Sequence, residues 1–182
     1  MMEVNIKGTA NIVNTCLECG VEKLCHVSSA AALGHTDDGS PIDENTSWKT
    51  HKGSSGYSIS KFFSETEVWR GIEEGLKAVI VNPVVVLGPG NWHRGSSAMM
   101  TEISRGLSYY SSGSTGYVDV RDVVNCMIAL MKSDISGERF LLSSENVYFK
   151  DSFRMMSEAL GLSTKWKEAK PWMLEIAWRF EK

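Results

Sequence analysis

The chain has 182 residues and a formal net charge of −3, and 42% of its residues are hydrophobic. This composition is that of an ordinary folded domain with an apolar core. The sequence contains no Lys/Arg-rich run, no export signal and no apolar stretch long enough to cross a bilayer. We therefore expect a cytoplasmic protein that binds neither nucleic acid nor membranes.

The first ninety residues alternate between helical and extended patterns. Four apolar residues share one helical face at the start of the chain, and Gly20 suits the position just past that helix: Ile6, Ala10, Val13 and Leu17. Residues 23–29 read as a short strand, and 34–56 as a polar loop. A second helix is expected over 57–74, with these residues on its apolar side: Ile59, Phe62, Phe63, Trp69 and Ile72. A buried strand at 77–82 then ends near Pro83.

The second half continues the alternation. Helices are expected at 96–105, from about 119 to 132, at 152–160 and from Pro171 to the end, with extended pieces at 117–118 and 139–142. The helix that ends near Lys132 should use these apolar positions: Val120, Val123, Val124, Met127, Ile128 and Met131. Strands that alternate with helices predict an α/β fold, a parallel sheet with crossover helices.

Tyr57 and Lys61 carry the first chemical signal. On a helix, residues four apart share a face, so the phenol and the ammonium can point into one site. A nearby cation favours phenolate, which suits Tyr57 to proton transfer. The spacing alone is weak, because it also arises by chance.

Polar residues at two strand ends carry the second signal. Ser28 and Ser29 close one strand, and Asn82-Pro83 closes the next, leading to the turn 88–90. Parallel α/β folds place their ligand crevices at such ends. Each feature also has a plain structural interpretation: serines that satisfy backbone groups, and a turn.

The order and spacing of these segments resemble the extended short-chain dehydrogenase/reductases, the family of NAD(P)-dependent epimerases, dehydratases and dihydroflavonol-reductase-like enzymes. The segments that carry the resemblance are Asn5–Asn11, Val27–Gly34, Tyr57–Lys61, Val81–Gly90 and Tyr117–Val123. They run from the start of the chain to about residue 145.

The resemblance implies a role for each matching residue. Tyr57 would be the catalytic acid/base. Lys61 would favour ionisation of the phenol and hold the cofactor ribose, and Ser29 would polarise the substrate oxygen, with Ser28 the less favoured choice. The remaining matches are a helix asparagine that supports the site, Asn5, and positions beside the nicotinamide: Ser28, Pro83 and Val86.

No G-x-x-G-x-x-G or G-x-G-x-x-G motif occurs in the chain. The family carries that motif near its amino terminus, so we interpret this chain as the carboxyl-terminal part of such an enzyme, cut at both ends and inactive by itself. The expected architecture is a partial Rossmann-type parallel sheet over residues 1–90. Residues 91–182 would form a small substrate-binding region, with one returning strand near 139–142.

The resemblance implies an NAD- or NADP-dependent oxidoreductase. A sugar diphosphate would need several arginines. Arg105 and Arg121 have simpler explanations in a helix end and an ion pair, so Arg94 remains alone. A small carbonyl or alcohol is therefore the preferred substrate, with this expected pocket: Ser29, Asn82, Trp92, Arg94 and Met99 or Met100.

Three alternatives stay open beside this prediction. The first is a nucleotide-sugar epimerase or dehydratase, and the second is a non-catalytic regulator that binds a dinucleotide or a protein. The third is a metal-binding module that uses Cys16, Cys19, Cys25 and His26, although buried free cysteines explain these residues better and no metal is expected. A homodimer is the assembly we expect, if any.

Overall fold

The computed structural model describes residues 2–36, 39–50, 53–170 and 172–173. The chain divides into two units, each assembled from two stretches of sequence. Unit 1 comprises residues 1–84 and 121–143, and unit 2 comprises residues 85–120 and 144–182. The second stretch of unit 1 contains residues 139–142, for which the sequence predicts a returning strand.

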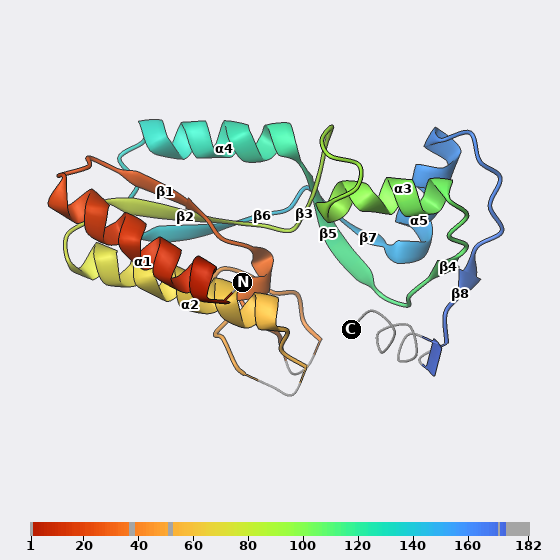
Figure 1. Ribbon diagram of the computed structural model, residues 1–182, viewed down its shortest axis with the longest axis horizontal. Helices are drawn as coiled ribbons and strands as arrows, with labels where there is room; N and C mark the ends of the chain where they lie inside the picture. The colour runs from red at the N-terminus through yellow and green to blue at the C-terminus, as the bar shows by residue number, and fades with distance from the viewer. Residues whose placement is uncertain (1, 37–38, 51–52, 171, 174–182) are drawn as a thin grey trace. The chain divides into compact units, whose positions relative to one another are not determined.

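Unit 1 is a three-stranded parallel sheet between helices. Its strands follow the order β1 (Leu24–Val27), β2 (Ala78–Pro83), β6 (Glu138–Leu142). Helices α1 (Met2–Glu18) and α2 (Gly56–Glu73) cover one face, and α4 (Val120–Lys132) lies over the other (Figure 1). A short 3-10 helix, η1 (Ala30–Ala32), follows β1. The expected α/β fold with a parallel sheet and crossover helices is thereby confirmed.

The centre of unit 1 is β2, all six residues of which are buried. Its apolar run at residues 78–81 is the pattern of a strand covered on both faces. The core beneath it joins α1, α2 and β2: Val13, Cys16, Val68, Leu76, Ala78 and Ile80. Gly71 lets the two helices approach closely, since a Cβ there would lie 2.4 Å from Cγ1 of Val13.

The buried face of α2 differs from the one that its large apolar residues predict. The residues it buries are mainly small or polar: Ser60, Ser64, Glu65, Val68 and Gly71. Phe63 is 45% exposed, and Phe62 stacks on Trp48 with ring centroids 4.7 Å apart. The prediction was right for Trp69 and Ile72, which pack against the core, and wrong for Phe63. Close packing of α1 and α2 requires small residues at their contact, and the aromatic rings lie beside it.

The apolar stripe of α4 is also less buried than expected. Val123 is its buried residue, while Val124, Ile128 and Met131 are each more than 40% exposed. Lys23 holds the end of this helix, because its ammonium donates hydrogen bonds to the carbonyl oxygens of Leu130 (2.5 Å) and Ser133 (2.8 Å).

Unit 2 has a mixed sheet of β3 (Val85–Leu87), β5 (Ser114–Asp119) and β7 (Glu145–Tyr148). β3 and β5 are parallel, and β5 and β7 are antiparallel. The strands β4 (Tyr109–Tyr110) and β8 (Lys167–Glu168) form a separate parallel pair. Helical segments complete the unit: η2 (Gly95–Ser97), α3 (Ala98–Ser104) and α5 (Phe149–Ala159).

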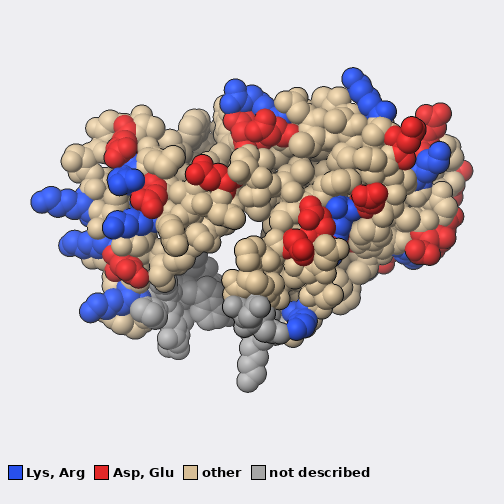
Figure 2. All heavy atoms as spheres, turned by 180° about the vertical axis from the view of Figure 1, so that it is seen from behind, with Lys and Arg blue, Asp and Glu red and all other residues tan. Residues whose placement is uncertain are grey.

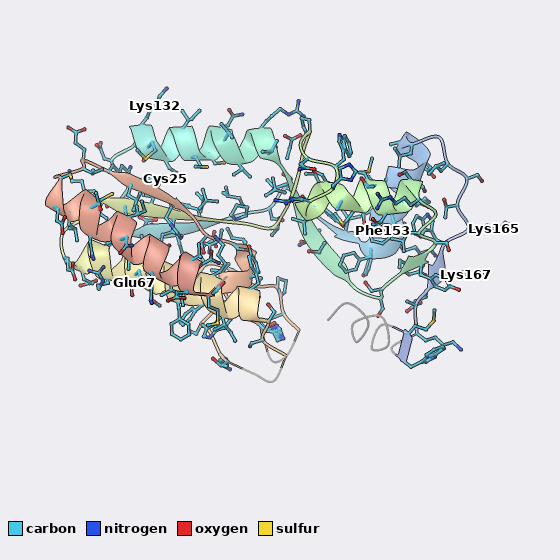
Figure 3. All side chains as sticks on the ribbon, viewed as in Figure 1. Cys25, Glu67, Lys132, Phe153, Lys165 and Lys167 are labelled. Atoms are coloured by element: carbon cyan, nitrogen blue, oxygen red, sulfur yellow. The ribbon has the colours of Figure 1, made fainter. Side chains whose placement is uncertain are left out.

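The core of unit 2 is apolar and aromatic. Ile103, Tyr117 and Met156 are buried at its centre. Phe153, labelled on α5 in Figure 3, lies 5.4 Å from Trp166 between ring centroids. The strand β7 was not expected from the sequence, because Glu145–Tyr148 has no alternating apolar pattern. The backbone pairing with β5 decides its conformation.

The helix expected from Pro171 to the end lies outside the described residues, apart from Trp172 and Met173.

Basic and acidic side chains are interspersed on the face that Figure 2 shows. Within the described part of the chain, no helix combines the length and the apolar character that a membrane span requires.

Candidate active site

The helix α2 begins directly at the predicted catalytic motif. Ser55 caps it, since its hydroxyl oxygen accepts a hydrogen bond from the backbone N–H of Ser58 at 3.0 Å. Tyr57 stands in the first turn with 43% of its surface exposed. Lys61 follows one turn later on the same helix, as the four-residue spacing predicts.

Lys61 ties this helix to the end of β1. Its ammonium donates a hydrogen bond of 3.1 Å to the carbonyl oxygen of Val27, the last residue of that strand. Burial lowers the pKa of Lys61, and the nearby Glu65 carboxylate opposes that shift. Val27 lies two residues before Ser29, so the ammonium of Lys61 is held near the carboxyl end of β1. Parallel α/β folds form their ligand crevices at such strand ends.

The two serines after β1 have different environments. Ser29 is partly exposed, and its side-chain oxygen caps η1 by accepting from the N–H of Ala31 at 3.2 Å. Ser28 is 5% exposed, and its hydroxyl oxygen is buried with no hydrogen-bond partner among the described residues. Of the two serines, Ser29 is the one with surface to offer to a ligand.

Asn5 and Lys61 line one open groove of about 400 Å³. Its walls are α1, β1 and α2, and its polar side chains include Thr9, His26 and Ser64. Asn5 donates from Nδ2 to the hydroxyl of Ser60 at 3.0 Å, and the hydroxyls of Thr9 and Ser64 lie 2.6 Å apart. The structure thus brings together three segments that are separate in the sequence.

His26 is a member of this groove that the sequence suggested only as a metal ligand. Its Nε2 is buried and has no hydrogen-bond partner among the described residues. Burial, assisted by the positive charge of Lys61, lowers the pKa of His26 to about 4, with Glu65 opposing. The imidazole is therefore neutral at pH 7. The alternation of side chains along β1 is the signal that could have placed His26 beside Lys61.

Asn82 has a different environment from the one expected of a substrate ligand. It is fully buried, and its amide donates to the carbonyl oxygen of Ser29 at 3.0 Å and to Glu65 Oε2 at 2.8 Å. Pro83 is buried beside it and pairs with Leu142 of β6. This placement favours a role for Asn82 in holding the end of β1, not in contacting a substrate.

The other predicted ligand-binding residues lie in unit 2. Val86 is in β3, and its carbonyl oxygen accepts a hydrogen bond from Ser96. Trp92 is 49% exposed, and Arg94 is exposed at the start of η2. Met99 and Met100 are partly buried and pack on the core of unit 2.

The metal hypothesis finds no cluster of ligands. Among the described residues, no three His, Cys, Asp or Glu side chains gather in a way that could hold an ion. The four cysteines are free, with Cys16 buried and Cys19 exposed. Burial also raises the pKa of the Cys25 thiol, which disfavours the thiolate form that binds metals.

Unit 1 has the parallel sheet and the crossover helices of a Rossmann-type fold. Its helix α2 carries Tyr57 and Lys61 at the spacing of the short-chain dehydrogenase/reductase motif. The family model of the NAD dependent epimerase/dehydratase family matches residues 1–142. The chain belongs to this family, and the resemblance found in the sequence is confirmed.

Individual relatives include reductases. The chain is 28% identical to a candidate dihydroflavonol 4-reductase of Synechocystis sp. over 185 residues, which covers 98% of this chain and 54% of that protein. It is 26% identical over 191 residues to the cinnamoyl-CoA reductase CAD2 of Medicago truncatula, covering 95% and 57% of the two chains. The crystal structure of gox2253 superposes with a TM-score of 0.85 at 33% identity, covering 100% of this chain and 56% of that one.

A more distant structure shows the fold alone. The nucleoside-diphosphate-sugar epimerase PA4631 of Pseudomonas aeruginosa has a TM-score of 0.85 at 22% identity, over 97% of this chain and 60% of that one. The chain spans about half the length of the curated relatives it matches.

Proposed function

We propose that this chain supplies the catalytic half of an NAD(P)-dependent oxidoreductase that interconverts a carbonyl and an alcohol. One observation carries the proposal: the ammonium of Lys61 donates a hydrogen bond to the carbonyl oxygen of Val27 at the end of β1. Lys61 shares helix α2 with Tyr57 and lines the same groove as Asn5. Side chains from α1, β1 and α2 thus meet in one groove beside β1, and Lys61 reaches from it to the end of the strand that leads to Ser29. Reductases among the relatives support the choice of substrate class.

The residues of this site fit a nicotinamide cofactor. When bound, the cofactor supplies or accepts hydride at a substrate carbon. Lys61 offers ammonium hydrogens to ribose hydroxyls, and partly exposed Tyr57 and Ser29 can reach a substrate oxygen. In reduction, the Tyr57 hydroxyl gives its proton to that oxygen while the Ser29 hydroxyl donates a hydrogen bond to it. In oxidation, Tyr57 takes the proton back.

The substrate is the finer part of the proposal. Trp92 and Arg94 lie in one exposed loop of unit 2, and we propose that they meet the substrate together with Met99. A single arginine beside an aromatic ring suits a small carbonyl compound. A sugar diphosphate would leave more negative charge to neutralise.

A fusion protein tests the function. A glycine-rich dinucleotide-binding βαβ segment of the same family is placed ahead of residue 1, and the product is assayed with small ketones and aldehydes and with UDP- and GDP-sugars. Turnover of the carbonyl compounds, lost on Lys61→Met, is expected. Efficient conversion of the nucleotide sugars alone would make the chain part of an epimerase. Cofactor binding without turnover of either class would favour a regulator.

The chain alone should bind NAD(P) weakly. A dinucleotide gains much of its affinity from a glycine-rich turn and a helix amino terminus at its pyrophosphate, and the 182 residues contain no such motif. Calorimetry with residues 1–182 should therefore show little heat below millimolar ligand. Micromolar binding would mean that the pyrophosphate is held in another way.

A further inference from the structure

Glu65 is a carboxylate in the interior of unit 1. It is 2% exposed and lies one turn after Lys61 on α2. Its Oε1 pairs with the guanidinium of Arg139 at 3.1 Å, and its Oε2 accepts the 2.8 Å hydrogen bond from Asn82. A buried ion pair of this kind often adds little net stability, because desolvation offsets the attraction. Its geometry therefore points to what it holds in place.

Asn82 extends this contact to the end of β1. Its Nδ2 has two hydrogens: one goes to Glu65 and the other goes to the carbonyl oxygen of Ser29 at 3.0 Å. Asn82 is fully buried, so water does not compete for these bonds. The backbone of Ser29 is thereby tied to α2 through one intervening side chain.

Arg139 fixes the far side of Glu65. Its guanidinium also donates to the carbonyl oxygens of Glu44 at 2.8 Å and Thr46 at 3.2 Å. The Glu44 carboxylate in turn accepts from the backbone N–H of Leu141 in β6 at 2.8 Å. Loop 44–46 and strand β6 thus hold the guanidinium, and the carboxylate of Glu65 has a fixed position.

We propose that Glu65 and Asn82 are positioning residues that set the place of the Ser29 hydroxyl relative to Tyr57 and Lys61. Ser29 enters the site from β1, while the other two come from α2. The hydrogen bonds from Asn82 to Glu65 and to the Ser29 carbonyl oxygen connect α2 to the end of β1 in the buried interior of unit 1. The effect on catalysis rests on the proposed function, but the effect on the position of Ser29 does not.

The charge of Glu65 acts on the same site. Its carboxylate opposes the effect of burial on Lys61 and on His26, in each case favouring the protonated form. Removing this charge should therefore lower the pKa of both groups further. A residue that only filled space would leave both titrations unchanged.

Three variants of the full 182-residue chain test the proposal. Asn82→Ala removes the link and leaves the Glu65–Arg139 ion pair. Glu65→Gln removes the charge. Glu67→Gln is the matched control, because Glu67 lies on the same helix (Figure 3) and pairs with Arg70 at 2.9 Å. The measurements are amide hydrogen exchange by NMR and titration of the Lys61 and His26 side chains.

Loss of the link in Asn82→Ala should make the amides of residues 31–33 exchange about tenfold faster, the equivalent of one hydrogen bond. Glu65→Gln keeps a side-chain oxygen that can accept from Asn82, so its exchange at 31–33 should rise less. Amides of β2 measure the global change in each variant. Glu65→Gln should also lower the pKa of Lys61 and His26, and Glu67→Gln should do neither. If amide exchange at residues 31–33 rises no more than amide exchange in β2, the proposal is overturned. Asn82→Ala alone decides this point if Glu65→Gln does not fold.

The catalytic consequence is read in the fusion protein. There Asn82→Ala should lower kcat by about tenfold or more while KM for the cofactor stays within about twofold, since a misplaced hydroxyl weakens the reaction more than binding. If the unaltered fusion protein is inactive, the proposed function fails, and the exchange result still decides the positioning role. An unchanged kcat despite faster exchange would limit Asn82 to local structure.

Discussion

Units 1 and 2 use polar side chains in opposite ways. In unit 1 the predicted site residues are held from several elements, as when Lys61 reaches β1 and Asn82 joins β1 to α2. In unit 2 the predicted substrate residues Trp92 and Arg94 lie exposed in one loop over an apolar and aromatic core.

Under the proposed function, unit 1 carries the proton transfer and the loop of unit 2 carries the choice of substrate. Proton transfer depends on fixed distances, which a network of buried hydrogen bonds provides. Recognition of different substrates is served by loops on a rigid support, since loops can change without cost to the core. We expect substitutions in unit 1 to affect rate, and those in the loop of unit 2 to affect which substrate reacts.

The largest expected effect is on catalysis in unit 1. In the active fusion protein, Tyr57→Phe should lower kcat by about 10² to 10⁴, because the proton donor and acceptor is lost. Steady-state kinetics measures this effect. The matched control is Tyr148→Phe, a tyrosine of unit 2 that is 66% exposed and should leave kcat unchanged. Equal losses in both variants would contradict the separation of roles.

The next effect is acid destabilisation through His26. Folding lowers its pKa from 6.5 to about 4, so the unfolded chain binds the extra proton between these values. Its contribution to stability is complete above about pH 6.5 and is lost as the pH falls toward 4. The loss amounts to about 3 kcal/mol.

Urea unfolding at pH 7 and pH 4.5 measures this loss. His26→Gln should remove part of the decrease in stability, while His93→Gln, at an exposed histidine of unit 2, should leave the decrease as it is. Parallel pH profiles for the protein with and without His26 would show that its burial is not maintained in solution.

The close contact of α1 and α2 gives the third prediction. In Gly71→Ala the new methyl group would lie 2.4 Å from Val13 Cγ1 and 3.4 Å from Leu76. Overpacking of this kind should cost about 1–3 kcal/mol in the free energy of unfolding. Gly8→Ala in α1 has no atom within 4 Å of the new carbon and should instead stabilise by about 0.5–1 kcal/mol. Urea titration of both variants compares them directly.

The smallest effect is expected in unit 2. The hydroxyl of Tyr117 donates to Ser152 at 3.0 Å inside the core, and Tyr117→Phe should cost about 1 kcal/mol in thermal or urea unfolding. Tyr109→Phe, at a residue that is 40% exposed, should stay within about 0.5 kcal/mol of the unaltered chain. A cost above that of Gly71→Ala would reverse the ranking of the two units.

The sequence by itself determined the alternating α/β order and the family. The continuous apolar run of β2 marks a strand buried on both faces, and the four-residue spacing of Tyr57 and Lys61 places both on one helix. These features could be predicted because each depends on neighbours within a few positions along the chain.

The tertiary structure decided which side chains these elements bury and link. α2 turns Ser60, Ser64 and Gly71 toward α1, which lies too close for large residues. Glu65 is turned inward toward Asn82 and Arg139. Asn82 holds Ser29 and His26 lies beside Lys61 because parallel pairing of β1 with β2 aligns their ends. Such contacts join residues that are dozens of positions apart, so a local sequence pattern can indicate the face of one partner, as the alternation along β1 does for His26, but not the contact itself. Their energies depend on burial, which exists only in the folded chain.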